Sequence, residues 1–193
     1  MDMWSFLAER FDLPILEWIA ANLRSAFLDA VMPVITLLGD AGIFWIAIAA
    51  LCLFFPKTRK MGLSMGAALV IGLLLCNVTL KPLVQRIRPY DYQLEHFGKT
   101  IQLLIAAQHD FSFPSGHTIA SFEAATVILL YNRKLGIPAM ILAVLIAFSR
   151  LYLYVHDPTD VLASVVLGIG IAFLGTFLVK KGYALYEAKR KKA

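Results

Sequence analysis

Three short stretches of the sequence place basic, imidazole and hydroxyl side chains beside long apolar runs. They begin at Lys81 (KPLVQRIRP), Phe113 (FPSGHT) and Ser149 (SRLYLYVHDPTD). A charged side chain within an apolar run of membrane-spanning length is expensive and marks a candidate functional site. Each stretch is therefore a candidate, and each also has a simpler structural explanation.

The first stretch carries three cations, Lys81, Arg86 and Arg88. If a helix continues through it, Lys81 and Arg88 lie two turns apart on one face, and we expect Pro89 to end that helix near Arg88. Guanidinium groups pair well with phosphoryl oxygens, and a lysine adds a point charge. The simpler explanation is a basic helix end anchored to lipid phosphates.

The second stretch has the residues of a helix start. Ser115 is predicted to be the N-cap, with His117 in the first turn. Gly116 lets the backbone approach a ligand closely, and a helix N-terminus offers free N–H groups and a positive dipole to an anion. The simpler explanation is an ordinary turn and cap, so this stretch alone is weak evidence for a site.

The third stretch places Arg150 within an apolar segment and His156 at its mouth. Asp157 before Pro158 is typical of a helix cap and first helical position. Asp160 follows His156 by four residues, so its carboxylate can accept the imidazole N–H and orient the ring. The simpler explanation is that both acids complement a helix dipole.

Together the three stretches supply cations, histidines and a helix N-terminus that match a tetrahedral dianion such as a phosphoryl group. One histidine can attack phosphorus while the other protonates the departing oxygen. The sequence offers no carboxylate cluster suited to Mg²⁺, so the cations are expected to replace a metal. The chemistry indicated is phosphoryl transfer without a metal or cofactor.

The composition indicates that these stretches belong to a membrane protein. Of 193 residues, 60% are hydrophobic and 16% charged, the mean hydropathy is +0.73, and soluble domains carry roughly 25% charged residues. We expect an all-α transmembrane bundle forming one domain over residues 1–193. Five apolar segments are predicted to span the bilayer, at 43–55, 61–80, 117–131, 137–154 and 161–179.

Residues 1–40 fit this pattern less well. Their apolar positions have helical spacing, but Glu17, Arg24 and Asp29 interrupt them, and the longest unbroken apolar run is too short to cross a bilayer. We expect amphipathic helices lying at the outer interface or packed on the bundle. A sixth, charged span is the alternative.

The basic residues suggest an orientation. Most of those behind the net charge of +5 lie at 57–60, at 133–134 and near the C-terminus, which predicts that these loops and the C-terminus are cytoplasmic in a multi-pass cell-membrane protein. This placement favours contact with lipid headgroups over binding to nucleic acid. The three candidate stretches then share the extracytoplasmic face, where cations are normally few, which favours function over anchoring.

At these residues the sequence resembles the type 2 phosphatidic-acid phosphatase family, which shares its active site with the vanadium haloperoxidases. The family signature is a Lys, six residues, then Arg-Pro; Pro-Ser-Gly-His; and Ser-Arg, five residues, His, three residues, Asp. The chain matches every specified position in order between residues 81 and 160. The resemblance implies a helical membrane bundle with the site near the outer surface.

The resemblance also implies a role for each matched residue. His156 is implied as the nucleophile that forms a phosphohistidine, oriented by Asp160, and His117 as the acid that protonates the leaving group. The implied phosphate-binding residues are Lys81, Arg88, Ser115, Gly116 and Arg150. No metal and no cofactor are implied.

The resemblance leaves the lipid open. A bacterial undecaprenyl diphosphate phosphatase and a phosphatidylglycerol phosphate or phosphatidic acid phosphatase are the leading expectations, and the oligomeric state is not indicated. A lipid phosphotransferase using the same site, a lipid transporter or scramblase, and a non-catalytic lipid-binding protein are the alternatives. Glu123 falls inside a predicted span. Two roles are open for it, as a residue lining the pocket or as a buried acid whose hydrogen bonds are satisfied within the bundle.

Overall fold

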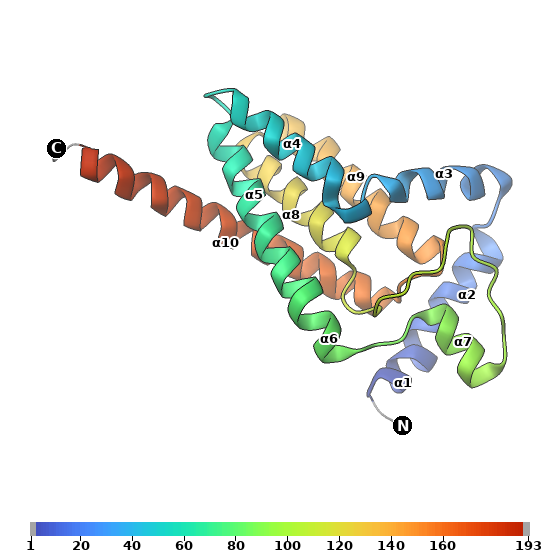
Figure 1. The fold of residues 1–193 in the computed structure, drawn as a ribbon. Coiled ribbons are helices and arrows are strands. Elements are labelled where there is room, and N and C mark those ends of the chain that lie inside the picture. The colour runs from blue at the N-terminus through green and yellow to red at the C-terminus, as the bar shows by residue number, and fades with distance from the viewer. Residues whose placement is uncertain (1–2, 191–193) are drawn as a thin grey trace.

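The computed structural model describes residues 3–190, and the regular secondary structure in this part is helical throughout (Figure 1). Residues 191–192, part of the basic C-terminal tail, lie outside the described residues. The α-helices are α1 Met3–Leu7, α2 Leu13–Asn22, α3 Ala26–Leu37, α4 Ile43–Phe54, α5 Arg59–Leu73, α6 Lys81–Val84, α7 Pro89–Phe97, α8 Gly116–Tyr131, α9 Arg133–Tyr152 and α10 Pro158–Arg190.

Helices α4, α5, α8, α9 and α10 form a bundle with α8 at its centre (Figure 1). Small residues allow this packing, because Ala124 and Ala125 are fully buried on α8. A Cβ at Gly168 of α10 would lie 2.9 Å from the Ile119 carbonyl oxygen of α8. The centre of the bundle therefore depends on close helix–helix contact, and α8 carries His117 into it.

Three helical stretches of the described chain are long and apolar enough to cross a membrane. They are Arg59–Phe97, which begins with α5 and includes the helical segments that follow it, Arg133–Tyr152 and Pro158–Arg190. Helices α3 and α4, bent by 42° at the break between them, would make a fourth span if they act as one. Helix α8 has 16 residues and α4 has 12. The apolar segments predicted from the sequence are thus helical, but not all reach the length of a spanning helix.

The helix after α5 does not run on to Arg88 as expected. The segment Leu74–Leu80 is π-helical, and α6 ends at Val84. Gln85 has a φ of 51°, in the left-handed region, which turns the chain out of the helix. Pro89 starts helix α7 rather than ending the preceding one, because proline fits the first turn of a helix.

The N-terminal helices pack against the end of the bundle that holds the three motifs (Figure 1). Leu13, Leu16 and Ile19 of this region share a buried cluster with residues 152–155. The neighbouring Asp12 is also fully buried. The N-terminal region therefore covers the segment that leads to His156.

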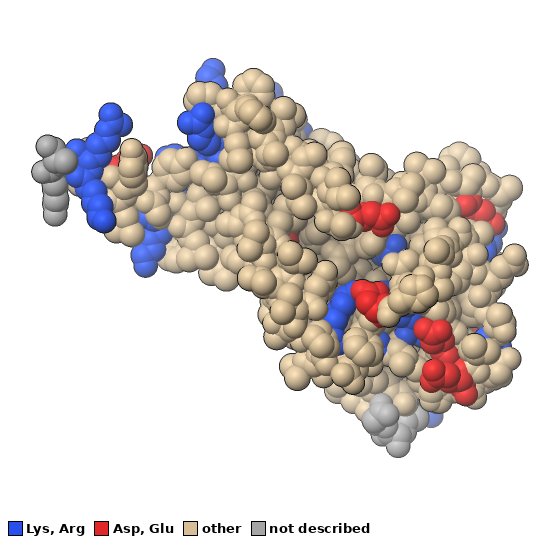
Figure 2. Space-filling model, in the orientation of Figure 1, with Lys and Arg blue, Asp and Glu red and all other residues tan. Residues whose placement is uncertain are grey.

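Figure 2 shows where charge gathers on one face. Lys and Arg side chains lie at the end where α4 turns into α5 and along the last part of α10, whereas Asp and Glu gather towards the opposite end. In the described part of the chain, Lys60 of α5 also contacts Tyr183 and Glu187 of α10. The basic loop before α5 and the end of α10 therefore lie together, as the positive-inside prediction requires.

Candidate active site

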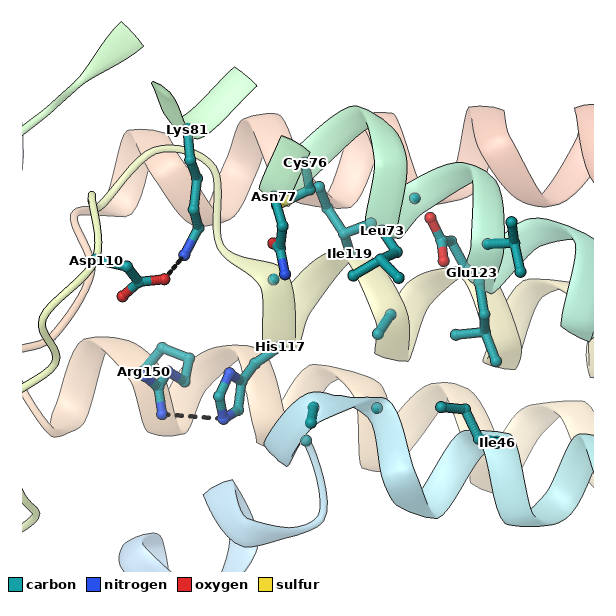
Figure 3. Close-up of a pocket in the computed structure, with 18 of the residues that line it drawn as sticks. Ile46, Leu73, Cys76, Asn77, Lys81, Asp110, His117, Ile119, Glu123 and Arg150 are labelled. Atoms are coloured by element: carbon teal, nitrogen blue, oxygen red, sulfur yellow. Dashed lines mark hydrogen bonds and ion pairs between the residues drawn. The ribbon is translucent and has the colours of Figure 1, made fainter. Parts of the chain in front are cut away.

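A cavity of about 470 Å³ opens between α4, α5 and α8 and the loops beside them (Figure 3). Of the eight residues predicted for the site, six line it; Ser115 and Asp160 are fully buried outside its lining. Its polar end holds cations and histidines, and its remainder is mostly apolar. The lining residues from the motifs are Lys81, Arg88, Gly116, His117, Arg150 and His156.

His156 lies in the connection between α9 and α10, with 1% of its surface exposed. Its Nδ1 is 3.5 Å from Asp160 Oδ2 and 3.4 Å from Ser112 Oγ, and its Nε2 is 3.4 Å from Arg88 Nη1. Burial, and then the charges of Arg88 and Arg150, lower the pKa of His156 well below its ordinary value. With the proton on Nδ1, the neutral ring has a free electron pair on Nε2.

Asp160 is held from several directions. Its Oδ1 accepts from Arg86 Nη1 at 2.5 Å, and its Oδ2 accepts from Ser112 Oγ at 2.5 Å and from the Asp157 N–H at 3.1 Å. A carboxylate this well satisfied has little freedom to rotate. It can therefore orient the His156 ring, which is the task that the motif spacing predicts.

Arg86 does not join the other cations in the cavity. Its Nη2 lies 2.7 Å from Asp12 Oδ2 and 3.1 Å from Asp157 Oδ2, and its guanidinium sits 4.8 Å from the centre of the Trp4 ring. Asp12 also accepts from the Thr159 N–H at 2.9 Å. Asp12 is not among the residues predicted from the sequence, because nothing in its local pattern separates it from other acids near the N-terminus.

The expected capping role of Asp157 is not seen. Its Oδ2 pairs with Arg86, and its Oδ1 has no hydrogen-bond partner among the described residues. Burial and the nearby Asp160 raise the pKa of Asp157 well above its ordinary value. The side chains that accept backbone N–H groups at this helix start are those of Asp160, from Asp157, and Asp12, from Thr159.

Lys81 and Arg88 converge on one carboxylate. Lys81 Nζ forms an ion pair with Asp110, and Arg88 Nη2 lies 2.5 Å from Asp110 Oδ1 (Figure 3 shows the lysine pair). Burial opposes ionisation of Asp110, but the Lys81 hydrogen bond and the charges of Lys81 and Arg88 outweigh it and lower the pKa of Asp110 to about 2. An anion therefore already bridges the two cations, although they come from different segments.

His117 and Arg150 form the facing side of the polar end (Figure 3). His117 Nε2 is 2.6 Å from Asp40 Oδ1 and 3.4 Å from Arg150 Nη1. Arg150 Nη1 donates to Thr36 Oγ1 at 2.6 Å. Since Thr36 and Asp40 flank the bend between α3 and α4, that bend positions both side chains, a contact the motifs do not predict.

Ser115 is the N-cap of α8, as predicted. Its Oγ accepts from the Thr118 N–H at 3.4 Å, and its own N–H donates to Ser164 Oγ at 2.8 Å. Gly116 lies at the cavity wall, where a Cβ would come 3.6 Å from Asn77 Oδ1. The helix start thus reaches the cavity through Gly116 and His117, while the Ser115 hydroxyl fixes the first turn.

Within residues 3–190, no group of three or more His, Cys, Asp or Glu side chains is arranged to hold a metal ion. The cavity instead combines three cations at one end with an apolar remainder. Such a surface suits a phosphorylated lipid, whose headgroup is anionic and whose tail is not.

Comparison with protein families agrees with this geometry. Residues 58–183 match the model of the PAP2 superfamily. The chain belongs to the PAP2 superfamily. Since this is the family that the three motifs resemble, the resemblance inferred from the sequence is confirmed.

Several characterised proteins are similar to this PAP2 chain. The undecaprenyl-diphosphatase of Sulfolobus acidocaldarius is 37% identical over 139 residues, covering 72% of this chain and 65% of its own length. Phosphatidylglycerophosphatase B of Bacillus subtilis is 33% identical over 169 residues, covering 80% of this chain and 77% of its own. The chain thus spans just under two thirds of the archaeal relative and about three quarters of the bacterial one.

Solved structures have the same fold. The transmembrane PAP2-type phosphatidylglycerolphosphate phosphatase from Bacillus subtilis aligns with a TM-score of 0.68 and 28% identity over 92% of each chain. A bacterial vanadium-dependent iodoperoxidase aligns with a TM-score of 0.62 and 17% identity, over 75% of this chain and 43% of its own, and shares the fold alone. With its apolar helices, this PAP2 chain is an all-α, multi-pass membrane protein.

Proposed function

We propose that this PAP2 protein is a metal-independent lipid phosphatase that hydrolyses a phosphomonoester or pyrophosphate through a phosphohistidine. The observation that carries the proposal is the position of His156 between Asp160 at Nδ1 and a cavity lined by three cations at Nε2. A neutral imidazole oriented by a carboxylate is a nucleophile, and fixed cations stabilise the charge of the transition state.

The reaction runs in two steps. Nε2 of His156 attacks phosphorus, the bond from phosphorus to the lipid oxygen breaks, and His117 gives its proton to that oxygen. Water then attacks the phosphohistidine while His117 takes a proton, which releases phosphate and the free imidazole. Lys81, Arg88 and Arg150 bind the phosphoryl oxygens throughout, aided by the Gly116 N–H and by the α8 start that Ser115 caps.

The substrate is proposed to be undecaprenyl diphosphate, or else phosphatidylglycerol phosphate or phosphatidic acid. The mostly apolar cavity beyond the cations supports a lipid. Relatives named for undecaprenyl diphosphate and for phosphatidylglycerophosphate are similarly close, at 37% and 33% identity. The family comparison therefore favours neither headgroup strongly.

The proposed setting is the cell membrane, with residues 1–193 forming one membrane-embedded domain. Residues 1–40 serve as its interfacial N-terminal region and 81–160 hold the signature. We propose five crossings, with α4 and α8 completed by adjoining residues, the site on the extracytoplasmic face and the C-terminus in the cytoplasm. The position of the basic loop and the end of α10 away from the cavity supports this orientation.

The test is phosphate release from purified protein in detergent micelles, using a panel of lipid phosphates and diphosphates. We expect activity that survives EDTA and that vanadate blocks competitively, because vanadate bound to the His156 nitrogen adopts the five-coordinate geometry of the transition state. Loss of activity in EDTA, restored by a divalent cation, would overturn the metal-independent mechanism. His156→Ala is expected to abolish turnover while the protein stays folded, and retained turnover would remove His156 as nucleophile.

A further inference from the structure

Glu123 is a buried acid that the proposed reaction does not use. It lies on α8, six residues beyond His117, with 1% of its surface exposed, and it lines the same cavity as the cations (Figure 3). Its Oε1 has no hydrogen-bond partner among the described residues. A polar group that is buried and unpaired costs free energy, so its retention at a cavity wall calls for a ligand.

The facing helix leaves space for this side chain. Gly72 of α5 lies opposite, and a Cβ at residue 72 would overlap Glu123 Oε1. The rest of the cavity wall at this depth is apolar, with Ile46, Val70 and Leu73 among its residues. Glu123 is thus a single polar group held open in the part of the cavity that receives the lipid rather than its phosphate.

The surroundings determine what Glu123 can bind. An ionised carboxylate away from any cation is very costly in an apolar pocket, so the neutral acid is the favoured form. A neutral carboxyl donates one hydrogen bond through its O–H. The group that satisfies it is therefore a hydrogen-bond acceptor on the substrate.

The depth of Glu123 limits where that acceptor lies. Six residues of α-helix rise roughly 9 Å, and the His117 and Glu123 side chains both lean back towards the N-terminus, so the carboxyl lies at that distance beyond the imidazole ring. A lipid with its phosphoryl group among the cations brings its first few atoms to this depth. In an acylated glycerol phosphate those atoms include ester carbonyls, which a dialkyl ether analogue lacks. A polyprenyl diphosphate brings the oxygens of its second phosphate there, and its hydrocarbon chain offers no acceptor beyond them.

We propose that Glu123 forms a subsite for an acyl carbonyl of the substrate, so that the cavity prefers acylated glycerol phosphates over their dialkyl ether analogues. This inference rests on the proposed phosphatase function and narrows its substrate class. Gly72 belongs to the subsite because it leaves the space that the carboxyl occupies.

The test compares two lipids that differ only at the carbonyls, a diacylglycerol phosphate and the dialkyl ether analogue of equal chain length, in the same micelles. We expect kcat/KM to be about fivefold higher for the ester, the effect of one buried hydrogen bond. Glu123→Leu is expected to remove this preference, and Glu123→Gln, whose amide still donates, to retain most of it. The same kcat/KM measurements with farnesyl diphosphate test a polyprenyl substrate.

Two glycines on α5 provide a matched pair. Gly72→Ala should displace the carboxyl and reduce the ester preference, whereas Gly66→Ala, which has no heavy atom within 4 Å of its added Cβ, should leave the preference unchanged. Equal rates on ester and ether with the wild-type protein, or a preference that survives Glu123→Leu, would overturn the subsite. The subsite would also be overturned if Glu123→Leu lowered kcat/KM for farnesyl diphosphate alone. No release of phosphate from any lipid would instead overturn the proposed function.

Discussion

The two nitrogens of the His156 ring face different surroundings, one a buried hydrogen-bonded group and the other a cavity. At Nδ1, Asp160 is fixed by Arg86, Ser112 and a backbone N–H, and every member of this group is buried. At Nε2, Arg88 lies beside a cavity, and the carboxylate that it shares with Lys81 belongs to Asp110, whose side chain is 55% exposed.

The difference separates two tasks within one site. The inner side behaves as part of the core, since its hydrogen bonds are made before any substrate arrives, and it holds the nucleophile in place. On the outer side, Lys81 and Arg88 pair with Asp110, and His117 pairs with Asp40, and a phosphoryl group has to replace these carboxylates. Substitutions on the inner side should therefore change kcat, and those on the outer side should change affinity.

Among residues that do not touch His156, the largest effect is expected at the far end of the inner group. Asp12→Asn keeps the size of the side chain but removes one of three carboxylates that hold Arg86, and Arg86 in turn holds Asp160. We expect kcat to fall on the order of tenfold, equivalent to about 1.4 kcal/mol in the barrier, with KM within twofold. Steady-state kinetics on the best lipid phosphate measure both constants.

The control for Asp12→Asn is Glu17→Gln. Glu17 is also an N-terminal acid, but it pairs with Lys99 at the surface, and exposed pairs contribute little. Glu17→Gln should therefore leave kcat and KM unchanged. If Asp12→Asn raised KM with kcat unchanged, the division of the site into two tasks would be wrong.

The inner side also shows what sequence reasoning could not reach. The spacing of the motifs predicted that His156 and Asp160 are adjacent, because Asp160 lies in the first turn of the helix that follows His156. Ser115 is the cap that its type suggests. Asp12 and Arg86 are 74 residues apart, and their contact depends on how the N-terminal helices pack. No local pattern encodes that packing.

The loops set a second limit on prediction. A helix continuing from Lys81 to Arg88 was expected, but the left-handed Gln85 ends it, so the two cations meet through a loop and share Asp110. Arg86 was grouped with them by type and lies instead on the opposite side of His156. Residue type and spacing identified the family, whereas the partners of each charge required the fold.

A further effect should appear in the pH dependence of stability. The folded protein disfavours protonation of His156, whose pKa is well below its ordinary 6.5, while the unfolded chain takes up the proton near that value. As pH falls below 6.5, the unfolded state therefore gains protons first. The free energy of unfolding then decreases by up to about 1.4 kcal/mol per pH unit.

The measurement is the unfolding temperature in detergent between pH 7.5 and 5. Wild type should lose stability towards pH 5 more steeply than His156→Gln, which lacks the titrating group. Asp157, whose pKa is raised, acts with the opposite sign, but it is present in both proteins and largely cancels in the comparison. Parallel curves for the two proteins would show that His156 is not held neutral.

The smallest effect is expected on the outer side, at Asp110. Its carboxylate forms ion pairs with Lys81 and Arg88. Because its pKa is about 2, it stays ionised throughout the working pH range and competes with phosphate for these cations. Asp110→Asn removes that competitor, and because water screens the half-exposed carboxylate, the inhibition constant of vanadate should fall only roughly fivefold. Glu95→Gln, an exposed acid on α7, is the control for lost surface charge. Weaker vanadate binding by Asp110→Asn would mean that Asp110 positions the two cations for the substrate instead of competing with it.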